Sequence, residues 1–254
     1  MDRSKFYAAL RARSSGVFGT SLSQSQVNGT EQILDEAQRR GTPLRHLAYI
    51  LSTAYHETAH TMQPVREMGG EKYLRSKRYY PWVGEGLVQV TWEENHRKFG
   101  ATAPGQMMTW PIALRAIFDG MTKGMFTGKK LDDYIKGDRS DYVGARRIVN
   151  GTDRDDDLAG YAKTFEGALR AANYLGIAPQ PRPTIPEYDE LLGKALKSTA
   201  PKPSVPKASE PKNEPVSTTS VVKETSTTRE PAKGLAFFLQ LITKAIAAWF
   251  SRGH

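Results

Sequence analysis

Two glutamates ten residues apart, Glu57 and Glu67, are of a type and spacing that could do chemistry. Glu57 lies at the flank of an apolar helical pattern, and a carboxyl backed by apolar neighbours tends to hold a proton near neutrality. Pro64 ends that pattern and turns the chain before Glu67, where the adjacent Arg66 would favour an ionised carboxylate if the two side chains meet. Hydrolysis of a glycosidic bond uses one protonated and one ionised carboxyl, although two ordinary surface glutamates would give the same pattern.

The same segment also matches a zinc-peptidase motif, His56-Glu57-x-x-His60. In that motif two histidines one helical turn apart bind the metal, and the glutamate acts as the base. A third ligand is needed. Residues 61–71 contain no further histidine, and no glycine stands at the spacing of the extended motif. A zinc metallopeptidase therefore stays an alternative, while our first expectation is a site with no metal and no cofactor.

A short block after Gly84 carries neutral hydrogen-bonding side chains. Gly84-x-Gly86 lets the backbone approach a neighbour closely. The alternation over residues 88–91 predicts an extended segment with Gln89 and Thr91 on one side. Amides, hydroxyls and nearby aromatic rings suit a sugar or a peptide better than a phosphate.

Three segments share their residue types and order with one enzyme family. They are His56-Glu57-Thr58, then Gly84-x-Gly86-Leu87-Val88-Gln89-Val90-Thr91-x-x-x-Asn95, and finally Arg147-Ile148-Val149-Asn150-Gly151. Over roughly residues 1–180 the chain resembles glycoside hydrolase family 19, the chitinase group that includes phage endolysins. The resemblance implies a mostly α, lysozyme-like domain with a central cleft between two helical lobes. It also implies inverting hydrolysis of a β-1,4 bond to an N-acetylated amino sugar.

Carried over to this sequence, the resemblance makes Glu57 the general acid and Glu67 the base that positions water. It assigns the binding of that water and of sugar hydroxyl or acetamido groups to four neutral side chains: Gln89, Thr91, Asn95 and Asn150. The sequence departs from the family at Glu85, where arginine usually stands between the glycines. The base is therefore either Glu67 or Glu85. Smaller departures are His60, where many members have glycine, and His96, where tyrosine is usual.

Helical periodicity supplies the elements that must position these residues. We expect helices over residues 32–40, 44–60, 110–125 and 158–175, and we find no long alternating strand pattern. Thr42-Pro43 reads as a capping residue followed by a proline at the first helical position. The acidic run over residues 153–157 lacks the glycine and terminal glutamate of a calcium loop and is more typical of a helix N-terminus. The sequence thus predicts a mostly α domain over residues 1–192.

The rest of the chain has a different composition. Residues 198–233 contain six prolines and twelve Ser or Thr, with no aromatic residue, so we expect a disordered linker over 193–233. Residues 234–254 are strongly apolar with a thin polar stripe, which predicts an amphipathic helix that lies on a membrane. A tail anchor in which Lys244 reaches the interface, and a helix that folds back onto the domain, are the alternatives.

The net charge of +9 is unevenly divided along the 254 residues. Residues 1–192 carry 26 basic and 23 acidic side chains, and residues 193–254 carry 10 and 4. The excess therefore points to an anionic envelope or membrane surface and argues against nucleic acid. A basic run beside tyrosines, from Lys72 to Arg78, is interpreted as a wall of the site that meets an anionic polymer. No cysteine is present, which excludes disulfides and thiol chemistry.

These patterns favour a monomeric endolysin that cuts the glycan strands of peptidoglycan. The N-terminus has no apolar core before Arg11, so we expect synthesis in a bacterial cytoplasm without a cleaved signal and action in the periplasm or cell wall. A chitinase on the same fold and the zinc metallopeptidase are alternative enzymes. A third class is a membrane-active protein whose domain only recognises glycan.

Overall fold

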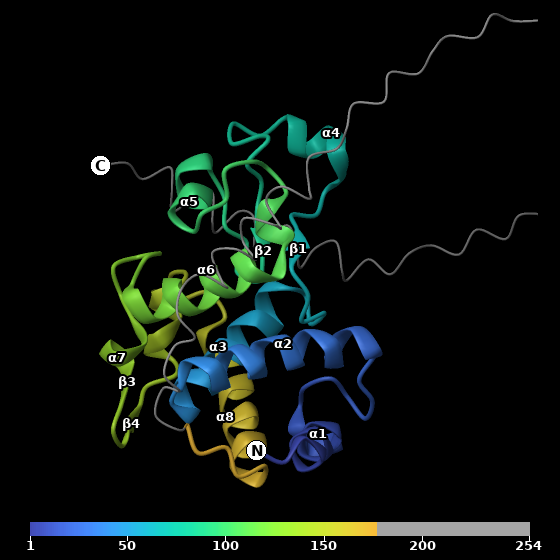
Figure 1. Cartoon of the computed structure of the whole chain (residues 1–254), viewed down its shortest axis with the longest axis vertical. Coiled ribbons are helices and arrows are strands. Elements are labelled where there is room, and N and C mark those ends of the chain that lie inside the picture. The colour runs from blue at the N-terminus through green and yellow to red at the C-terminus, as the bar shows by residue number, and fades with distance from the viewer. Residues whose placement is uncertain (177–254) are drawn as a thin grey trace, which may run out of the picture. The chain divides into compact units, whose positions relative to one another are not determined.

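The computed structural model describes residues 1–176, and this part of the chain is mostly helical (Figure 1). The α-helices are α1 (Arg3–Arg11), α2 (Gln24–Arg40), α3 (Leu44–Glu57), α4 (Gly70–Arg75), α5 (Glu93–Lys98), α6 (Trp110–Lys123), α7 (Leu131–Tyr134) and α8 (Asp155–Ala171). Short 3-10 helices are η1 (Arg13–Ser15), η2 (Gln106–Met108) and η3 (Gly144–Ile148). The predicted fold class, mostly α, is confirmed.

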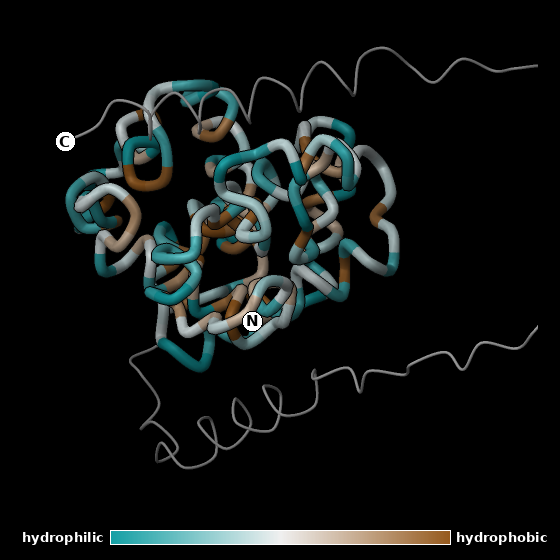
Figure 2. The backbone as a smooth tube through the Cα atoms, turned by 90° about the horizontal axis from the view of Figure 1, so that it is seen from above, coloured by the Kyte–Doolittle hydropathy of each residue, from teal (hydrophilic) through white to brown (hydrophobic). Residues whose placement is uncertain are grey.

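Helix α3 forms the centre of the core. Every residue from His46 to Glu57 is buried, so this helix has no face that is open to solvent. Helix α8 packs along α3 more extensively than any other described element, and α1 packs on α8. The hydrophobic stretches of the backbone alternate with hydrophilic ones, as expected when the outer helices each bury one face (Figure 2).

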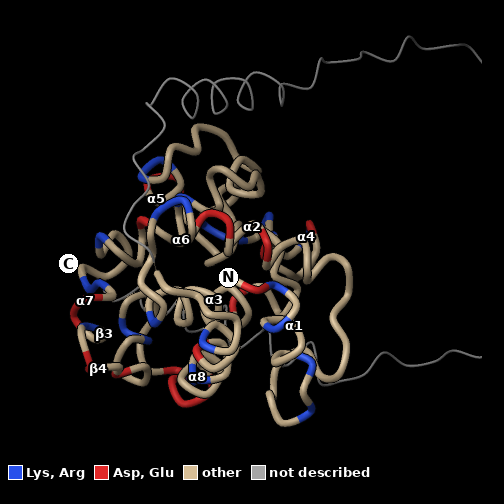
Figure 3. The backbone as a smooth tube through the Cα atoms, turned by 60° about the horizontal axis from the view of Figure 1, so that its bottom comes forward, with Lys and Arg blue, Asp and Glu red and all other residues tan. Residues whose placement is uncertain are grey.

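Four strands of two residues each complete the described elements. Strands β1 (Val65–Arg66) and β2 (Glu85–Gly86) pair antiparallel, with Val65 opposite Gly86 and Arg66 opposite Glu85. Strands β3 (Ile135–Lys136) and β4 (Arg139–Ser140) form a separate small hairpin. Around that hairpin and α7 the backbone carries charges of both signs (Figure 3). The β1–β2 pair joins the segments that hold Glu67 and Glu85.

Several helices begin or end at residues other than the predicted ones. Helix α2 begins at Gln24, eight residues before the predicted start, under a capping box in which Ser23 and Gln26 bond each other's backbone. Helix α3 ends at Glu57 instead of residue 60. Pro43 itself is the N-cap of α3 and no side chain caps this helix, so the expected capping role of Thr42 is wrong. Helix α8 does begin with the acidic run, as predicted.

The predicted linker over residues 193–233, the amphipathic helix over 234–254 and the domain boundary at 192 lie outside the described residues. Within residues 1–176, none of the helices has the length and apolar character that crossing a bilayer requires.

Candidate active site

Glu57 is the last residue of α3, and its carboxylate is buried against a single guanidinium. Arg146, from η3, donates from Nη1 to Glu57 Oε1 over 2.7 Å, and both side chains are almost completely buried. Arg146 Nε also donates to the carbonyl oxygen of Asp153 over 3.0 Å, which fixes the guanidinium from its other side. Glu57 is therefore a buried carboxyl group held by Arg146 rather than a surface residue.

Glu67 is buried just after β1 and accepts two hydrogen bonds. The hydroxyl of Tyr79 donates to Oε1 over 2.8 Å, and the backbone N–H of Gly84 donates to Oε2 over 3.0 Å. Burial, and then the bond to Glu67, raise the pKa of Tyr79, so the phenol stays protonated and acts as a donor. Both oxygens of Glu67 are thereby fixed in place.

Gly84 is the point where three of the predicted site residues meet. A Cβ placed on Gly84 would lie 3.0 Å from Gln89 Oε1, 3.4 Å from Thr91 Oγ1 and 3.5 Å from the Cβ of Glu67. A glycine is thus required here for close approach and not for an unusual backbone angle. The structure brings together one carboxylate, one amide and one hydroxyl at this point.

The way in which Gln89 reaches this point differs from the prediction. Gln89 has a φ of +51°, and Glu85 and Val90 exchange backbone hydrogen bonds around it. Residues 85–90 therefore form a tight turn, and the expected extended segment over 88–91 is wrong. The side chain of Gln89 is held by its Nε2, which donates to the carbonyl oxygen of Val65 over 2.9 Å. This bond ties the turn to β1, next to Glu67.

Asn95 and Asn150 lie in different segments and make different hydrogen bonds. Asn95, on α5, donates to the carbonyl oxygen of Thr91 over 2.9 Å and accepts from Lys98 over 2.8 Å, so it braces the segment that carries Thr91. Asn150 follows η3, and its backbone N–H bonds to the carbonyl oxygen of Arg146. Asn150 thus belongs with the Glu57–Arg146 pair, and Asn95 belongs with the Glu67 group. No hydrogen bond or ion pair between described residues links Glu57 directly to Glu67.

Glu85, the other candidate base, faces a different set of groups. Its Oε2 accepts from the backbone N–H of Gly105 over 2.9 Å, and Arg66 approaches its Oε1 at 3.8 Å. Burial raises the pKa of Glu85, against the opposing effects of Gly105 and Arg66. The ion-pair partners of Arg66 are Glu71 and Glu85, so the condition that its side chain meets Glu67 is not fulfilled.

The histidines of the zinc motif do not have the geometry that the motif requires. His60 lies beyond the end of α3 with a φ of +68°, and its ring stacks on Tyr55 at 4.1 Å between centroids. The two histidines are therefore not one turn apart on a helix, as zinc binding in this motif requires. In the described part of the chain, no three His, Cys, Asp or Glu side chains are grouped as a metal site would need. The residues present do not fit a zinc ion.

Two groups of the site were not identified from the sequence. Arg146 is 89 residues from Glu57, and nothing in its local sequence marks it as a partner of a buried carboxylate. Tyr79 lies in an aromatic segment, but its bond to Glu67 depends on the loop between β1 and β2 and leaves no local signal in the sequence. The basic run nearby is partly engaged with its own tyrosines, since Lys77 Nζ lies 3.7 Å from the centroid of the Tyr73 ring.

A scan against protein-family models found no match to this chain, and searches of curated proteins and of solved structures found none. What the site does must therefore be inferred from its own side chains. They comprise three buried carboxylates in different settings, one of which, Glu67, lies beside neutral amide and hydroxyl groups.

Proposed function

We propose that the chain is an endolysin-type peptidoglycan hydrolase that cleaves β-1,4 glycosidic bonds by general acid and base catalysis. One observation carries the proposal: Glu67 is fixed by Tyr79 and Gly84 beside Gln89 and Thr91. A carboxylate with both oxygens positioned, next to an amide and a hydroxyl, is suited to hold and activate a water molecule. Neutral polar groups around it suit a sugar.

In this proposal Glu57 is the general acid and Glu67 the base. Arg146 occupies Oε1 of Glu57, so the proton to be delivered is placed on Oε2. Glu67 is preferred over Glu85 because Glu85 is directed to Gly105 and Arg66 and away from the group around Gly84. Gln89 and Thr91 would contact sugar and water, with Asn95 bracing Thr91 and Asn150 beside Arg146.

The proposal includes a lysozyme-like arrangement in which the two carboxylates face each other across a cleft between two helical lobes. The helical content of residues 1–176 is consistent with that arrangement. It also includes a basic linker and a membrane-binding C-terminal helix that bring a monomeric enzyme to the anionic envelope, as inferred from the composition of residues 193–254. A chitinase with the same two carboxylates is the second candidate, because the same side chains would contact either polymer.

The test is clearance of Gram-negative cells whose outer membrane has been removed. We expect the purified protein to lower turbidity, Glu57→Gln to abolish this, and EDTA to leave it intact. Glu94→Gln is the matched control, since Glu94 is an exposed glutamate on α5 that is proposed neither for catalysis nor for contact with the sugar. Full activity of Glu57→Gln would disprove the glycosidase assignment.

Two further measurements define the product and the tail. Mass spectrometry of the new reducing end distinguishes cleavage after N-acetylmuramic acid from cleavage after N-acetylglucosamine, and a parallel assay on chitin tests the second candidate. Removal of residues 234–254 should spare hydrolysis of isolated peptidoglycan while reducing action on whole cells. Loss of both activities would contradict the separate membrane role of the tail.

A further inference from the structure

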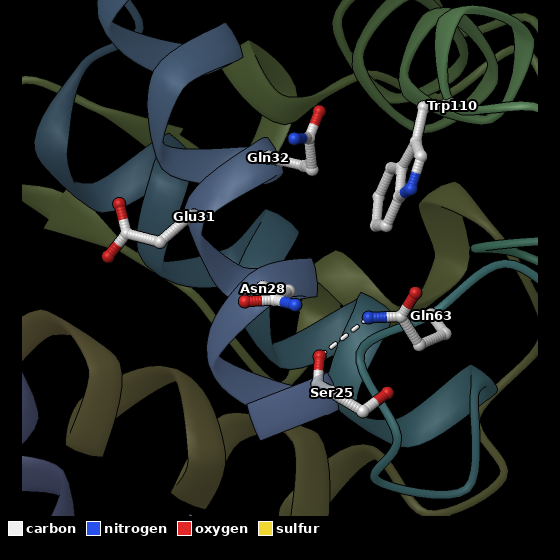
Figure 4. Close-up of a pocket in the computed structure, with 6 residues that line it drawn as sticks. All are labelled: Ser25, Asn28, Glu31, Gln32, Gln63 and Trp110. Atoms are coloured by element: carbon white, nitrogen blue, oxygen red, sulfur yellow. Dashed lines mark hydrogen bonds between the residues drawn. The ribbon is translucent and has the colours of Figure 1, made fainter. Parts of the chain in front are cut away.

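A polar pocket of about 530 Å³ lies apart from the carboxylates. It is lined by residues of α2, by the loop after α3 and by the first residue of α6: Ser25, Asn28, Glu31, Gln32, Gln63 and Trp110 (Figure 4). In Figure 4 the indole of Trp110 extends from α6 toward the space between Gln32 and Gln63. None of the residues proposed for catalysis or for contact with the cleaved bond lines this pocket.

The pocket is built on two segments that are bonded together. Gln63 Nε2 donates to the carbonyl oxygen of Ser25 over 2.6 Å, and Gln26 Nε2 donates to the carbonyl oxygen of His60 over 2.9 Å. Gly29 makes this contact possible, because a Cβ there would lie 1.9 Å from the carbonyl oxygen of Met62. The floor between α2 and the loop is therefore fixed, and Trp110 completes the wall.

The chemistry of the lining residues selects the class of ligand. The six lining residues include no lysine or arginine, so nothing in the pocket attracts an anion. The negative charge of Glu31 is already met by Arg3 at 3.1 Å and by the hydroxyl of Tyr7 at 2.7 Å. In Figure 4 the Glu31 carboxylate points away from Trp110. What remains is an indole face with a hydroxyl and three amides, of which Asn28 also accepts from Gln24 through Oδ1 and Gln63 also donates to Ser25 through Nε2.

An indole face with neutral donors and acceptors around it suits a pyranose ring. The C–H face of the sugar packs on the aromatic ring, while its hydroxyl and acetamido groups bond to the amides. We propose that this pocket is a second glycan-binding site, which takes an N-acetylated amino sugar of the strand that the enzyme cleaves. The inference rests on the proposed function, since it assumes that the polymer bound is a β-1,4 glycan. It goes beyond it by assigning a site that takes no part in the chemistry.

Nuclear magnetic resonance can observe this site directly. The full chain carrying Glu57→Gln is titrated with a β-1,4-linked tetramer of N-acetylglucosamine, and the indole N–H signal of Trp110, assigned with Trp110→Phe, is followed. We expect a saturable shift of that signal. Gln32→Ala should weaken the affinity read from it about fivefold, as expected for loss of one neutral hydrogen bond. Gln32 is exposed on a helix, so alanine there leaves the fold intact.

Gln38→Ala is the matched control, an exposed amide on the same helix outside the pocket. It should leave the affinity at Trp110 unchanged. A Trp110 signal that does not move with millimolar tetramer overturns the second site, as does a shift that Gln32→Ala and Gln38→Ala affect equally. Hydrolysis of purified peptidoglycan by the unmodified chain is measured separately and tests the proposed function by itself. A negative result in the Trp110 titration therefore does not imply a negative result in the hydrolysis assay, and the reverse also holds.

Discussion

At the scale of single residues, the two buried glutamates near β2 differ in what their oxygens contact. Both oxygens of Glu67 accept hydrogen bonds beside Gln89 and Thr91. Glu85 is bound by Gly105 and approached by Arg66. If Glu67 is the base, glutamine at position 67 removes the group that accepts the proton. Glutamine at position 85 removes only a carboxylate that contacts Gly105 and Arg66.

We therefore predict that Glu67→Gln lowers peptidoglycan hydrolysis by about 100-fold or more, the range for loss of a general base. Glu85→Gln should change the rate by less than about fivefold. The measurement is release of reducing ends from purified peptidoglycan, with circular dichroism to verify folding. If Glu85→Gln is the inactive variant and Glu67→Gln is active, the roles of the two carboxylates must be exchanged.

The Glu57–Arg146 pair gives a prediction about stability. Removing one partner of a buried ion pair leaves an uncompensated charge, which typically costs about 3–5 kcal/mol. Arg146→Met should therefore lower the free energy of unfolding by about that amount, measured by urea denaturation. The double variant Glu57→Met with Arg146→Met should recover most of the loss, because no buried charge remains. A double variant that is no more stable than Arg146→Met would show that the guanidinium acts through Asp153 or packing instead.

At the scale of elements, α2 is held against the loop after α3 by the absence of a side chain at Gly29. We predict that Gly29→Ala lowers the free energy of unfolding by about 1–3 kcal/mol, since the new Cβ would overlap Met62 O and backbone must move. Gly160→Ala on α8 is the matched control. Gly160 is exposed with open space around it, so alanine there should stabilise the helix by ~0.5–1 kcal/mol. Thermal unfolding of the two variants makes the comparison.

If Gly29→Ala were as stable as the unmodified chain, the contact between α2 and Met62 would not be required. In that case the pocket lined by Gln63 and Trp110 would lack the fixed floor on which the second glycan site depends.

The elements that the sequence predicted well are those set by local pattern. The start of α3 at Leu44, the start of α6 at Trp110 and the acidic start of α8 follow from periodicity and helix-terminus chemistry. The first turns of α2 were missed because Asn28 and Gly29 are poor helix formers, and this segment is held by contacts with residues 60–63.

The geometry around Gly84 could not be predicted from the sequence. The grouping of Glu67 with Gln89 and Thr91 was implied only by the family resemblance, and the structure places the three side chains near one another. The left-handed turn at Gln89 could not be foreseen, because that φ depends on the backbone pairing of Glu85 with Val90. Arg146 could not be assigned to Glu57 either, since a contact across 89 residues leaves no local signal.

At the scale of the whole molecule, two buried histidines make stability depend on pH. Burial lowers the pKa of His56 and His96 below the ordinary value of 6.5. The unfolded chain then binds protons first on acidification, so unfolding is favoured as pH falls through 6.5 toward the lowered values. We predict that the free energy of unfolding decreases from pH 7 to pH 5, with a slope of up to ~1.4 kcal/mol per pH unit for each histidine.

His96 allows that prediction to be tested at one position. Its Nε2 lies 2.7 Å from the carbonyl oxygen of Val90, so it is the donor, and Nδ1 is buried with no partner. A proton on Nδ1 would therefore have no acceptor. His96→Gln keeps an amide donor but cannot titrate, so urea denaturation between pH 7 and 5 should show a shallower slope. Glu85 has the opposite effect on the pH dependence of the free energy of unfolding. Burial raises its pKa, so its ionisation as pH rises destabilises the folded chain. If His96→Gln has the same slope as the unmodified chain, the proton is taken up elsewhere, and the other buried histidine, His56, is the next position to replace.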